Sequence, residues 1–120
     1  MSTKTQESFI KSIAESDTIL TTLGFFQQST EKKGYATYIN YKRDETLICF
    51  MLGPSDWNVE ISLYTNKTKY EFKDLLAISS IAQWTSNNKF VQTNEDIIKD
   101  EVIWFMEFVR FSLTEILNEG

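Results

Sequence analysis

The side chains that could do chemistry are few, because the chain has no histidine and a single cysteine. Without histidine it lacks the commonest general base, the usual partner of a catalytic serine or cysteine, and most transition-metal sites. Cys49 lies in an apolar run, whereas a reactive thiolate needs an exposed and electropositive setting. We therefore interpret Cys49 as a small buried hydrophobic residue.

The carboxylates do not form an acid–base pair either. Asp100 and Glu101, like Asp44 and Glu45, are adjacent in sequence, and adjacent side chains on a helix point about 100° apart. Such neighbours do not converge on one reacting bond. The four glycines are far apart, and neither a phosphate-binding loop nor a calcium-loop pattern occurs. The sequence predicts a protein that is not an enzyme and that uses no cofactor and no metal.

The acidic residues are instead concentrated toward the C-terminus. Residues 94–120 hold seven acids and two bases, whereas residues 1–93 hold ten of each. The whole formal net charge of −5 therefore lies in this segment, which also contains the apolar run 102–106. Aromatic anchors with a charged rim are typical of protein-binding surfaces, so this segment is the first candidate for a binding site.

Projected onto a helix, the segment has two apolar stripes. The first predicts the core face and consists of Ile98, Val102, Phe105, Met106, Val109, Leu113, Ile116 and Leu117. The second consists of Ile97, Trp104, Phe108 and Phe111, with Asp96, Asp100 and Glu107 along one flank. Two interpretations stay open at this point. Either another helix of the chain, such as the N-terminal one, covers the second stripe, or the stripe is an exposed patch that binds a partner.

The second candidate surface is the solvent face of a strand expected at residues 57–64, with the turns before it. Its members are polar or aromatic residues: Asp44, Glu45, Asp56, Asn58, Glu60, Ser62 and Tyr64. A plain solvated sheet face explains the same residues, and Asp56 is also a natural turn residue. Both interpretations are compatible with the sequence.

The elements that would hold these surfaces begin with a helix at residues 5–23, which Gly24 ends in a left-handed conformation. The stretch 27–34 is polar, and the sequence assigns no element to it. Residues 35–42, 46–52 and 57–64 then have the period of strands, and short turns join them into an antiparallel meander. The middle strand is apolar on both faces, which predicts that it is covered on both sides.

The helical period returns from about Tyr70, although residues 67–72 could instead begin as a short fourth strand. Thr93 and Asp96 resemble a capping box that opens a last helix, ending at about Asn118. The order is α-β-β-β-α-α, which predicts a single α+β domain over residues 1–120. Its three-stranded antiparallel sheet, or four-stranded sheet in the alternative, packs with one N-terminal and two C-terminal helices.

Composition narrows the class of partner. An acidic chain with a sequence pI of about 4.7 does not suit nucleic acid, whose phosphates bind clustered lysine and arginine. Residues 1–8 are polar with no apolar segment behind them, so no secretory signal is expected, and no apolar run is long enough to cross a membrane. The single cysteine suits a reducing compartment. We expect a cytoplasmic protein.

The layout resembles that of small acidic bacterial immunity proteins, which accompany polymorphic or contact-dependent inhibition toxins. The resemblance rests on Leu23-Gly24-Phe25, Ile39-Asn40-Tyr41, the run 57–63 and the run 72–76 within the α-β-β-β-α-α order. It implies a protein that neutralises a cognate toxin domain, often a basic nuclease, by covering its active site or an adjacent surface. It carries over no catalytic residue.

The same layout resembles class I type III secretion chaperones, which are small, acidic, homodimeric α+β proteins. Their order places two strands between the last two helices, and residues 85–92 leave room for one at most. A homodimeric chaperone-like or structural module is therefore the alternative to an immunity protein with a basic partner. The candidate partner-binding residues are Asp44, Glu45, Asp56, Glu60, Tyr64, Asp100, Trp104, Glu107, Phe108 and Phe111.

Overall fold

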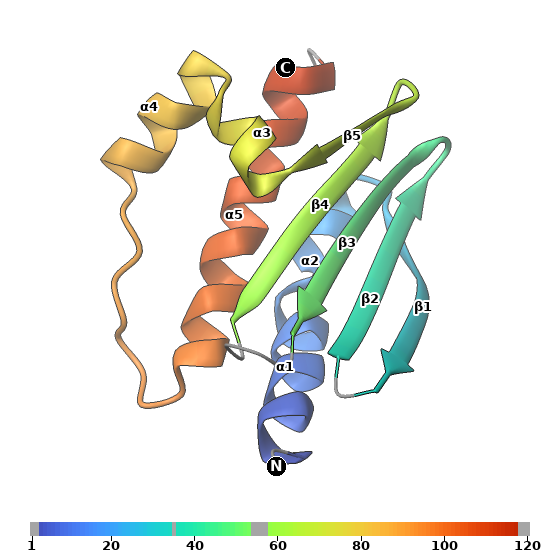
Figure 1. Cartoon of the computed structure of the whole chain (residues 1–120), viewed down its shortest axis with the longest axis vertical. Coiled ribbons are helices and arrows are strands. Elements are labelled where there is room, and N and C mark those ends of the chain that lie inside the picture. The colour runs from blue at the N-terminus through green and yellow to red at the C-terminus, as the bar shows by residue number, and fades with distance from the viewer. Residues whose placement is uncertain (1–2, 35, 54–57, 118–120) are drawn as a thin grey trace.

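The computed structural model of the chain describes residues 3–34, 36–53 and 58–117, and it has an α+β architecture. In chain order the elements are α1 (Thr3–Ser16), α2 (Thr18–Thr22), β1 (Phe26–Lys33), β2 (Ala36–Arg43), β3 (Thr46–Leu52), β4 (Val59–Thr65), β5 (Thr68–Glu71), α3 (Phe72–Leu76), α4 (Ser79–Asn87) and α5 (Ile97–Leu117). The strands form one antiparallel meander in the order β1-β2-β3-β4-β5. Figure 1 shows α1, α2 and α5 packed behind one face of this sheet.

The three predicted strands are confirmed as β2, β3 and β4, which form the centre of the sheet. Asn40 pairs with Cys49, and Cys49 pairs with Ser62, so one register runs across all three strands. The predicted third strand began at Trp57, which lies outside the described residues, as does Asp56. The meander is therefore correct in type and direction but has two more strands than the three that the sequence predicts.

The polar stretch after the first helices, to which the sequence assigns no element, forms the strand β1. Seven of its eight residues are exposed, so its side chains carry no alternating pattern. It lies at the edge of the sheet, where the backbone hydrogen bonds to β2 hold it and a polar sequence with paired lysines discourages further pairing. An exposed edge strand that is held mainly by backbone pairing leaves no periodic signal in the sequence.

The alternative of a short additional strand near residues 67–72 is confirmed as β5. Asn66 and Lys67 both have positive φ angles, of 53° and 63°, as a two-residue turn of the hairpin type requires. β5 pairs with residues 62–65 of β4 and ends where the chain turns into α3. At that point the backbone N–H of Glu71 donates to the carboxylate of Asp74 at 2.9 Å, which caps the helix.

The predicted N-terminal helix is interrupted at Asp17 and continues as α2. Its end is confirmed: Gly24 has a φ of 92°, its N–H donates to the Thr21 carbonyl, and the Phe25 N–H donates to the Leu20 carbonyl, both at 3.0 Å. This is the paired bonding of a Schellman motif, with the buried Leu20 and Phe25 side chains at its two ends. The motif turns the chain sharply toward the sheet.

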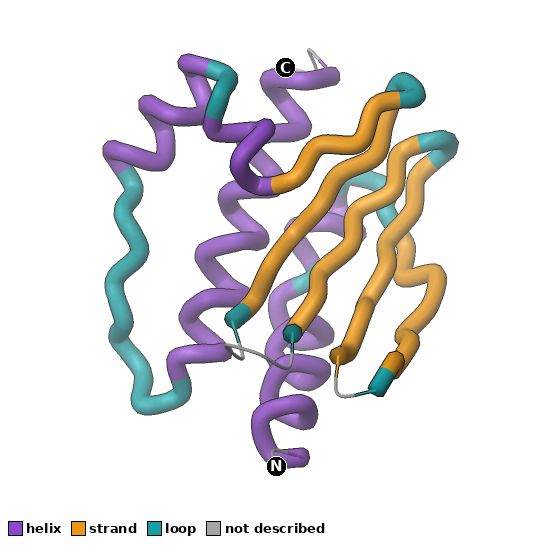
Figure 2. The backbone as a smooth tube through the Cα atoms, viewed as in Figure 1, coloured by secondary structure: helices purple, strands orange, loops and turns teal. Residues whose placement is uncertain are grey.

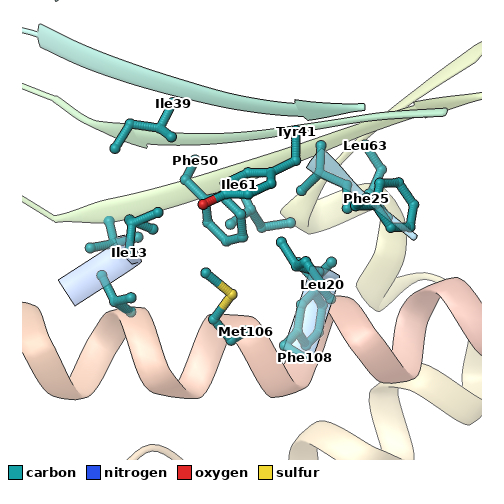
Figure 3. Close-up of a cluster of buried hydrophobic side chains, with 14 of the residues drawn as sticks. Ile13, Leu20, Phe25, Ile39, Tyr41, Phe50, Ile61, Leu63, Met106 and Phe108 are labelled. Atoms are coloured by element: carbon teal, nitrogen blue, oxygen red, sulfur yellow. The ribbon is translucent and has the colours of Figure 1, made fainter. Parts of the chain in front are cut away.

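The core lies between the sheet and the layer formed by α1, α2 and α5 (Figure 3). Tyr41 is fully buried there, and its hydroxyl donates to the Asp17 carboxylate at 2.7 Å. On the opposite face of the sheet Leu47, Cys49 and Met51 are only half-buried. The prediction that the middle strand is covered on both sides is therefore wrong, and Cys49 is half-buried instead of buried.

The C-terminal third contains three helices, where the sequence predicted two. The helix expected from Tyr70 is split into α3 and α4 between Leu76 and Ser79. The predicted capping box at Thr93 is also wrong, because α5 begins at Ile97 and the Ile98 N–H donates to the Asp96 carboxylate at 3.1 Å. Residues 88–96 form a long loop between α4 and α5, visible at the edge of the molecule in Figure 2. We call it the 88–96 loop.

Candidate functional site

The two stripes predicted on the last helix exist on α5, and the first one faces the sheet as expected. Ile98, Val102, Met106, Val109 and Leu113 are all buried, with no more than 5% of their surface exposed. Phe105 departs from this stripe. It is half-buried, and its ring packs against the Phe72, Trp104 and Phe108 rings at centroid distances of 5.5, 5.0 and 6.1 Å.

The second stripe is covered from within the chain at Trp104, Phe108 and Phe111, whereas its first member, Ile97, is 43% exposed. Trp84 of α4 stacks on Phe111 at 5.6 Å and an interplanar angle of 16°, and it also meets Phe108 at 6.0 Å. Phe72 of α3 lies 5.0 Å from Phe108, which is fully buried. The cover is provided by α3 and α4, whereas α1, the helix suggested from the sequence, packs elsewhere along α5. We call Phe72, Trp84, Trp104, Phe108 and Phe111 the aromatic cluster.

Asp100 anchors the 88–96 loop, because its carboxylate accepts four hydrogen bonds from the loop. Its carboxylate accepts hydrogen bonds from the backbone N–H groups of Thr93 and Asn94, both at 2.7 Å, from the Asn94 amide at 2.6 Å and from the Thr93 hydroxyl at 3.1 Å. These donors, the Asn94 N–H foremost, hold the pKa of Asp100 below its usual value. The other end of the loop is held by Trp104, whose indole N–H donates to the Asn88 carbonyl at 2.6 Å.

The remaining acids of α5 do not form a continuous rim. Glu107 pairs with Arg110 one turn later, and Asp96 caps α5 and accepts a hydrogen bond from Ser8 of α1. Glu101 points toward the sheet and accepts the Val59 N–H at 3.4 Å. Its pKa is raised, mainly because the side chain is half-buried. Local contacts therefore account for several acids that the sequence suggested as partner contacts.

An apolar surface that the sequence does not predict lies between the 88–96 loop and α5. Phe90 and Val91 of the loop are 37% and 67% exposed, and Ile103 of α5 is 43% exposed. All three line one groove, with a volume of about 480 Å³ and with the Trp104 ring and Glu107 also on its walls. We call these three residues the loop–helix patch. Half of the six large hydrophobic residues that are exposed in the described part of the chain belong to it.

A signal for this patch was present in the sequence. Phe90 and Val91 are the only large apolar residues between positions 85 and 96, and Ile103 belongs to neither stripe of α5. The sequence did not indicate that the loop would lie beside that position on α5. Of the predicted site residues, Asp100, Trp104 and Glu107 line this groove, whereas Phe108 is buried and Phe111 is half-buried.

The second predicted surface is not brought together as one site. Glu45 and Tyr64 line a small hollow of about 250 Å³ with Asn66 and Lys67, at one end of the sheet. Glu60 lies toward the other end of β4, opposite Met51, while Asp44 is in the β2–β3 turn with a φ of 53°. Asp56 lies outside the described residues. The exposed carboxylates of this face are therefore spread along the sheet.

Two observations concern the cysteine and the possible metal ligands of the described residues. Burial raises the pKa of the Cys49 thiol, which disfavours a thiolate. Within residues 3–34, 36–53 and 58–117 no cluster of cysteine and carboxylate groups is suited to hold a metal ion, and none of the helices described there is long and apolar enough to cross a membrane. The chain matched no protein-family model, no curated protein and no solved structure.

Proposed function

We propose that this protein is a non-enzymatic binding protein of the immunity type, which neutralises a basic toxin domain by covering its active site or an adjacent surface. The observation that carries the proposal is the loop–helix patch, where Phe90, Val91 and Ile103 expose apolar surface along one groove. Exposed apolar residues gathered in this way are typical of protein-binding surfaces. The proposed class of protein rests on the resemblance in size, acidity and the central meander, since β1, β5 and the additional helices depart from the predicted order.

Charge supports a basic partner. The chain carries a formal net charge of −5 and a sequence pI of about 4.7, which attracts a basic protein over distances up to the screening length of about 8–10 Å. Glu95, an exposed acid of the 88–96 loop, adds to this attraction. Long-range attraction raises the rate of encounter, and the apolar patch then supplies the contact that slows dissociation.

The anchoring of the loop supports the same function. Because Asp100 and Trp104 hold both ends of the 88–96 loop, Phe90 and Val91 are presented on a fixed backbone. A preorganised loop loses less conformational entropy on binding than a flexible one. The aromatic cluster supports the loop, because Trp104 of the cluster donates the hydrogen bond that holds Asn88.

The test is capture of partners by the full chain from its source organism, compared with two variants. Ile103→Asp places a charge in the patch, and Thr114→Asp places the same charge at an exposed position of α5 outside it. We expect the wild type and Thr114→Asp to retain one basic protein that Ile103→Asp loses. The purified pair should then associate more slowly as the salt concentration rises.

Two outcomes would contradict the proposal. The first is capture of the same proteins by all three chains, which would remove the patch from the interface. The second is a dimer of this chain, seen by sedimentation, that Ile103→Asp dissociates, because the patch would then bind its own copy. A captured toxin domain whose activity is unchanged in the complex would exclude the immunity type while leaving a binding function.

A further inference from the structure

The face of the sheet that is turned away from the core carries a regular grid of side chains. Figure 1 shows α1, α2 and α5 behind the sheet, so these helices leave its other face uncovered, and we call it the open face. Along β3 and β4 the side chains that are not buried alternate with buried ones, and residues directly opposite in antiparallel strands lie on the same face. The register therefore arranges the open face of the three central strands in three rows: Tyr38, Met51 and Glu60; Asn40, Cys49 and Ser62; Lys42, Leu47 and Tyr64.

The first row is acidic. It is extended on β1 by Glu31, which pairs with Tyr38, and it ends on β4 with Glu60. The Lys33 ammonium lies 3.6 Å from the Glu31 carboxylate and 5.4 Å from the centre of the Tyr38 ring. Within the described residues Glu60 has no ion pair. We call Glu31, Tyr38, Met51 and Glu60 the acidic row.

The third row is basic and exposes large hydrophobic side chains. Lys42 and Lys69, which pairs with Tyr64, are exposed, and in the described part of the chain neither lysine forms an ion pair. Phe26, which pairs with Lys42, is 69% exposed, and Tyr64 is 42% exposed. Among the described residues these are two of the three large hydrophobic side chains that are exposed outside the loop–helix patch. We call Phe26, Lys42, Leu47, Tyr64 and Lys69 the basic row.

The two outer rows match each other in charge but cannot meet within one chain, because they lie on the same face with the middle row between them. The middle row has short polar side chains with Cys49 at its centre, and its one charged residue in the described register is Glu71, at the margin of the sheet. A two-fold axis along the middle row, across the strands, places the acidic row of one copy against the basic row of a second copy. The same contact then occurs twice, so the open face is complementary to itself.

We propose that the open face binds a second copy of this chain, as a two-fold dimer in which the two sheets pack face to face. Sheets that pack in this way lie about 10 Å apart and interdigitate their side chains. Each strand then faces the same strand of the other copy. Met51 faces Leu47 of the other copy, and Glu60 faces Tyr64 of the other copy, with Lys69 one strand away. Opposite charges therefore meet on both sides of the axis.

The shape of the open face agrees with its charges. A hollow of about 500 Å³ opens at the acidic row, where Tyr38, Met51 and Glu60 line it, and it continues past β4 to Phe72. The exposed Tyr64 of the other copy is positioned to fill this hollow, with its hydroxyl directed toward Glu60. The two acids and two lysines that line the hollow sum to zero, which suits the neutral ring of a tyrosine.

The size of the open face predicts a weak dimer. With strands about 4.8 Å apart and rows about 6.8 Å apart, five strands and three rows cover roughly 500 Å² of each copy. This area is at the low end for specific interfaces, so monomer and dimer should exchange. The open face lies on the side of the sheet opposite α5, whereas the loop–helix patch lies on α5 and its preceding loop. The inference therefore goes beyond the proposed function and does not depend on that patch.

The test measures the dimer by sedimentation velocity of the full chain from about 10 µM to about 1 mM, the range in which a weak dimer dissociates. Glu60→Lys brings like charges together at both contacts of the dimer, and so does Lys69→Glu. Each variant should raise the dissociation constant about tenfold. An equimolar mixture of the two variants should recover the wild-type value, because each introduced charge then faces an opposite charge on the other variant.

Two exposed positions of α5 provide matched controls. Glu115→Lys and Lys99→Glu make the same changes of charge away from the open face, and neither should weaken the dimer as the open-face variants do. Each copy carries a formal net charge of −5, so an effect of net charge alone would make Glu60→Lys strengthen the dimer instead of weakening it.

Three outcomes would overturn the inference. The first is a wild type that stays monomeric at about 1 mM, and the second is a mixture that associates no better than either variant alone. The third is a dimer that Ile103→Asp dissociates and Glu60→Lys does not, because the loop–helix patch would then be the contact between copies. The third result also contradicts the proposed function, whereas the first two leave it unchanged.

Discussion

The aromatic cluster and the loop–helix patch are apolar surfaces of the same helix with opposite relations to solvent. Phe108 in the cluster is fully buried, whereas Ile103, five positions earlier on α5, is 43% exposed. Trp84 and Phe72 from the two preceding helices pack on the first surface, and the 88–96 loop only borders the second. Hydrophobicity alone therefore does not distinguish a core contact from a binding surface on this helix.

The two surfaces are mechanically connected through Trp104. Its ring stacks on Phe108 at 5.4 Å, and its indole N–H holds the start of the 88–96 loop. The cluster thus serves folding and also fixes the loop that carries Phe90 and Val91. Substitutions in the cluster should change stability first, whereas substitutions in the patch should change binding alone.

The largest expected effect is that of Phe108→Ala, which should lower the free energy of unfolding by about 3–5 kcal/mol, because it leaves a cavity under two tryptophans. Ile103→Ala should change it by less than about 0.5 kcal/mol, as surface substitutions usually do. Urea denaturation measures both. If Phe108→Ala prevents folding, Phe108→Leu gives the smaller loss that can be measured. Equal losses at Phe108 and Ile103 would show that the two surfaces are packed alike.

Removing the Trp84 side chain should expose part of the aromatic cluster to solvent, as the loop–helix patch is exposed. Trp84→Ala should cost about 0.5–1.5 kcal/mol for each ring pair that it removes, in addition to the lost burial, and should expose Phe111. The variant should also bind a hydrophobic dye more strongly than the wild type. Gln83→Ala, at the exposed neighbouring position of α4, is the control. Unchanged dye binding by Trp84→Ala would contradict a cover made by this one side chain.

A smaller effect is expected when the loop is released. Asp100→Ala removes the acceptor of the Thr93 and Asn94 N–H groups, so these amides should exchange faster with solvent while the sheet amides do not. Glu95→Ala, an exposed acid in the same loop, should leave the exchange unchanged. Slow exchange at Thr93 and Asn94 in the Asp100→Ala chain would mean that other contacts hold the loop.

The smallest expected effect concerns the neighbouring acids Asp100 and Glu101. Their contributions to folding stability should depend on pH with opposite signs. The pKa of Asp100 is lowered in the folded protein, so its contribution to stability is present above about pH 4 and is lost as the pH falls through the folded value. The pKa of Glu101 is raised, so its contribution is present below about pH 4 and is lost as the pH rises through the folded value.

Urea midpoints measured across the acidic range for Asp100→Asn and Glu101→Gln check these signs. Asp100→Asn should lose less stability than the wild type on acidification, because its side chain no longer titrates. Glu101→Gln should lose less than the wild type as the pH rises from about 4 toward neutrality. Each substitution is judged by how it changes the slope of stability against pH relative to the wild type. If both substitutions changed this slope in the same direction, the opposite environments of the two carboxylates would be contradicted.

Much of the central sheet could be predicted, because apolar and polar residues alternate along a strand that has one face buried in the core. Val59, Ile61 and Leu63 are buried, as the pattern of β4 predicts, and the turn at Gly24 was readable because few other residues adopt its φ. β1 was not readable, because an exposed edge strand needs no apolar residues. The split between α3 and α4 was equally hidden, since both halves have apolar residues at helical spacing.

The candidate site was predictable only in part. The sequence located the second stripe of α5, and it allowed that another helix covered it, but it did not identify Trp84 or Phe72 as the cover. It also suggested Asp100 as a partner contact, although the carboxylate is held by four donors of a loop six and seven residues earlier. Hydrogen bonds of this kind depend on how the loop folds back, which residue spacing does not specify.

The sequence by itself determined the α+β class, the central strands and the two apolar stripes of the last helix, because these depend on local periodicity and burial of apolar surface. Only the tertiary structure decided which apolar residues stay exposed, because that depends on how segments distant in the chain pack together. Trp84 lies on Phe111, whereas Phe90 and Val91 are held beside Ile103 without covering it. The apolar, acidic C-terminal segment therefore contributes both to the buried aromatic cluster and to the loop–helix patch, which is the candidate binding surface.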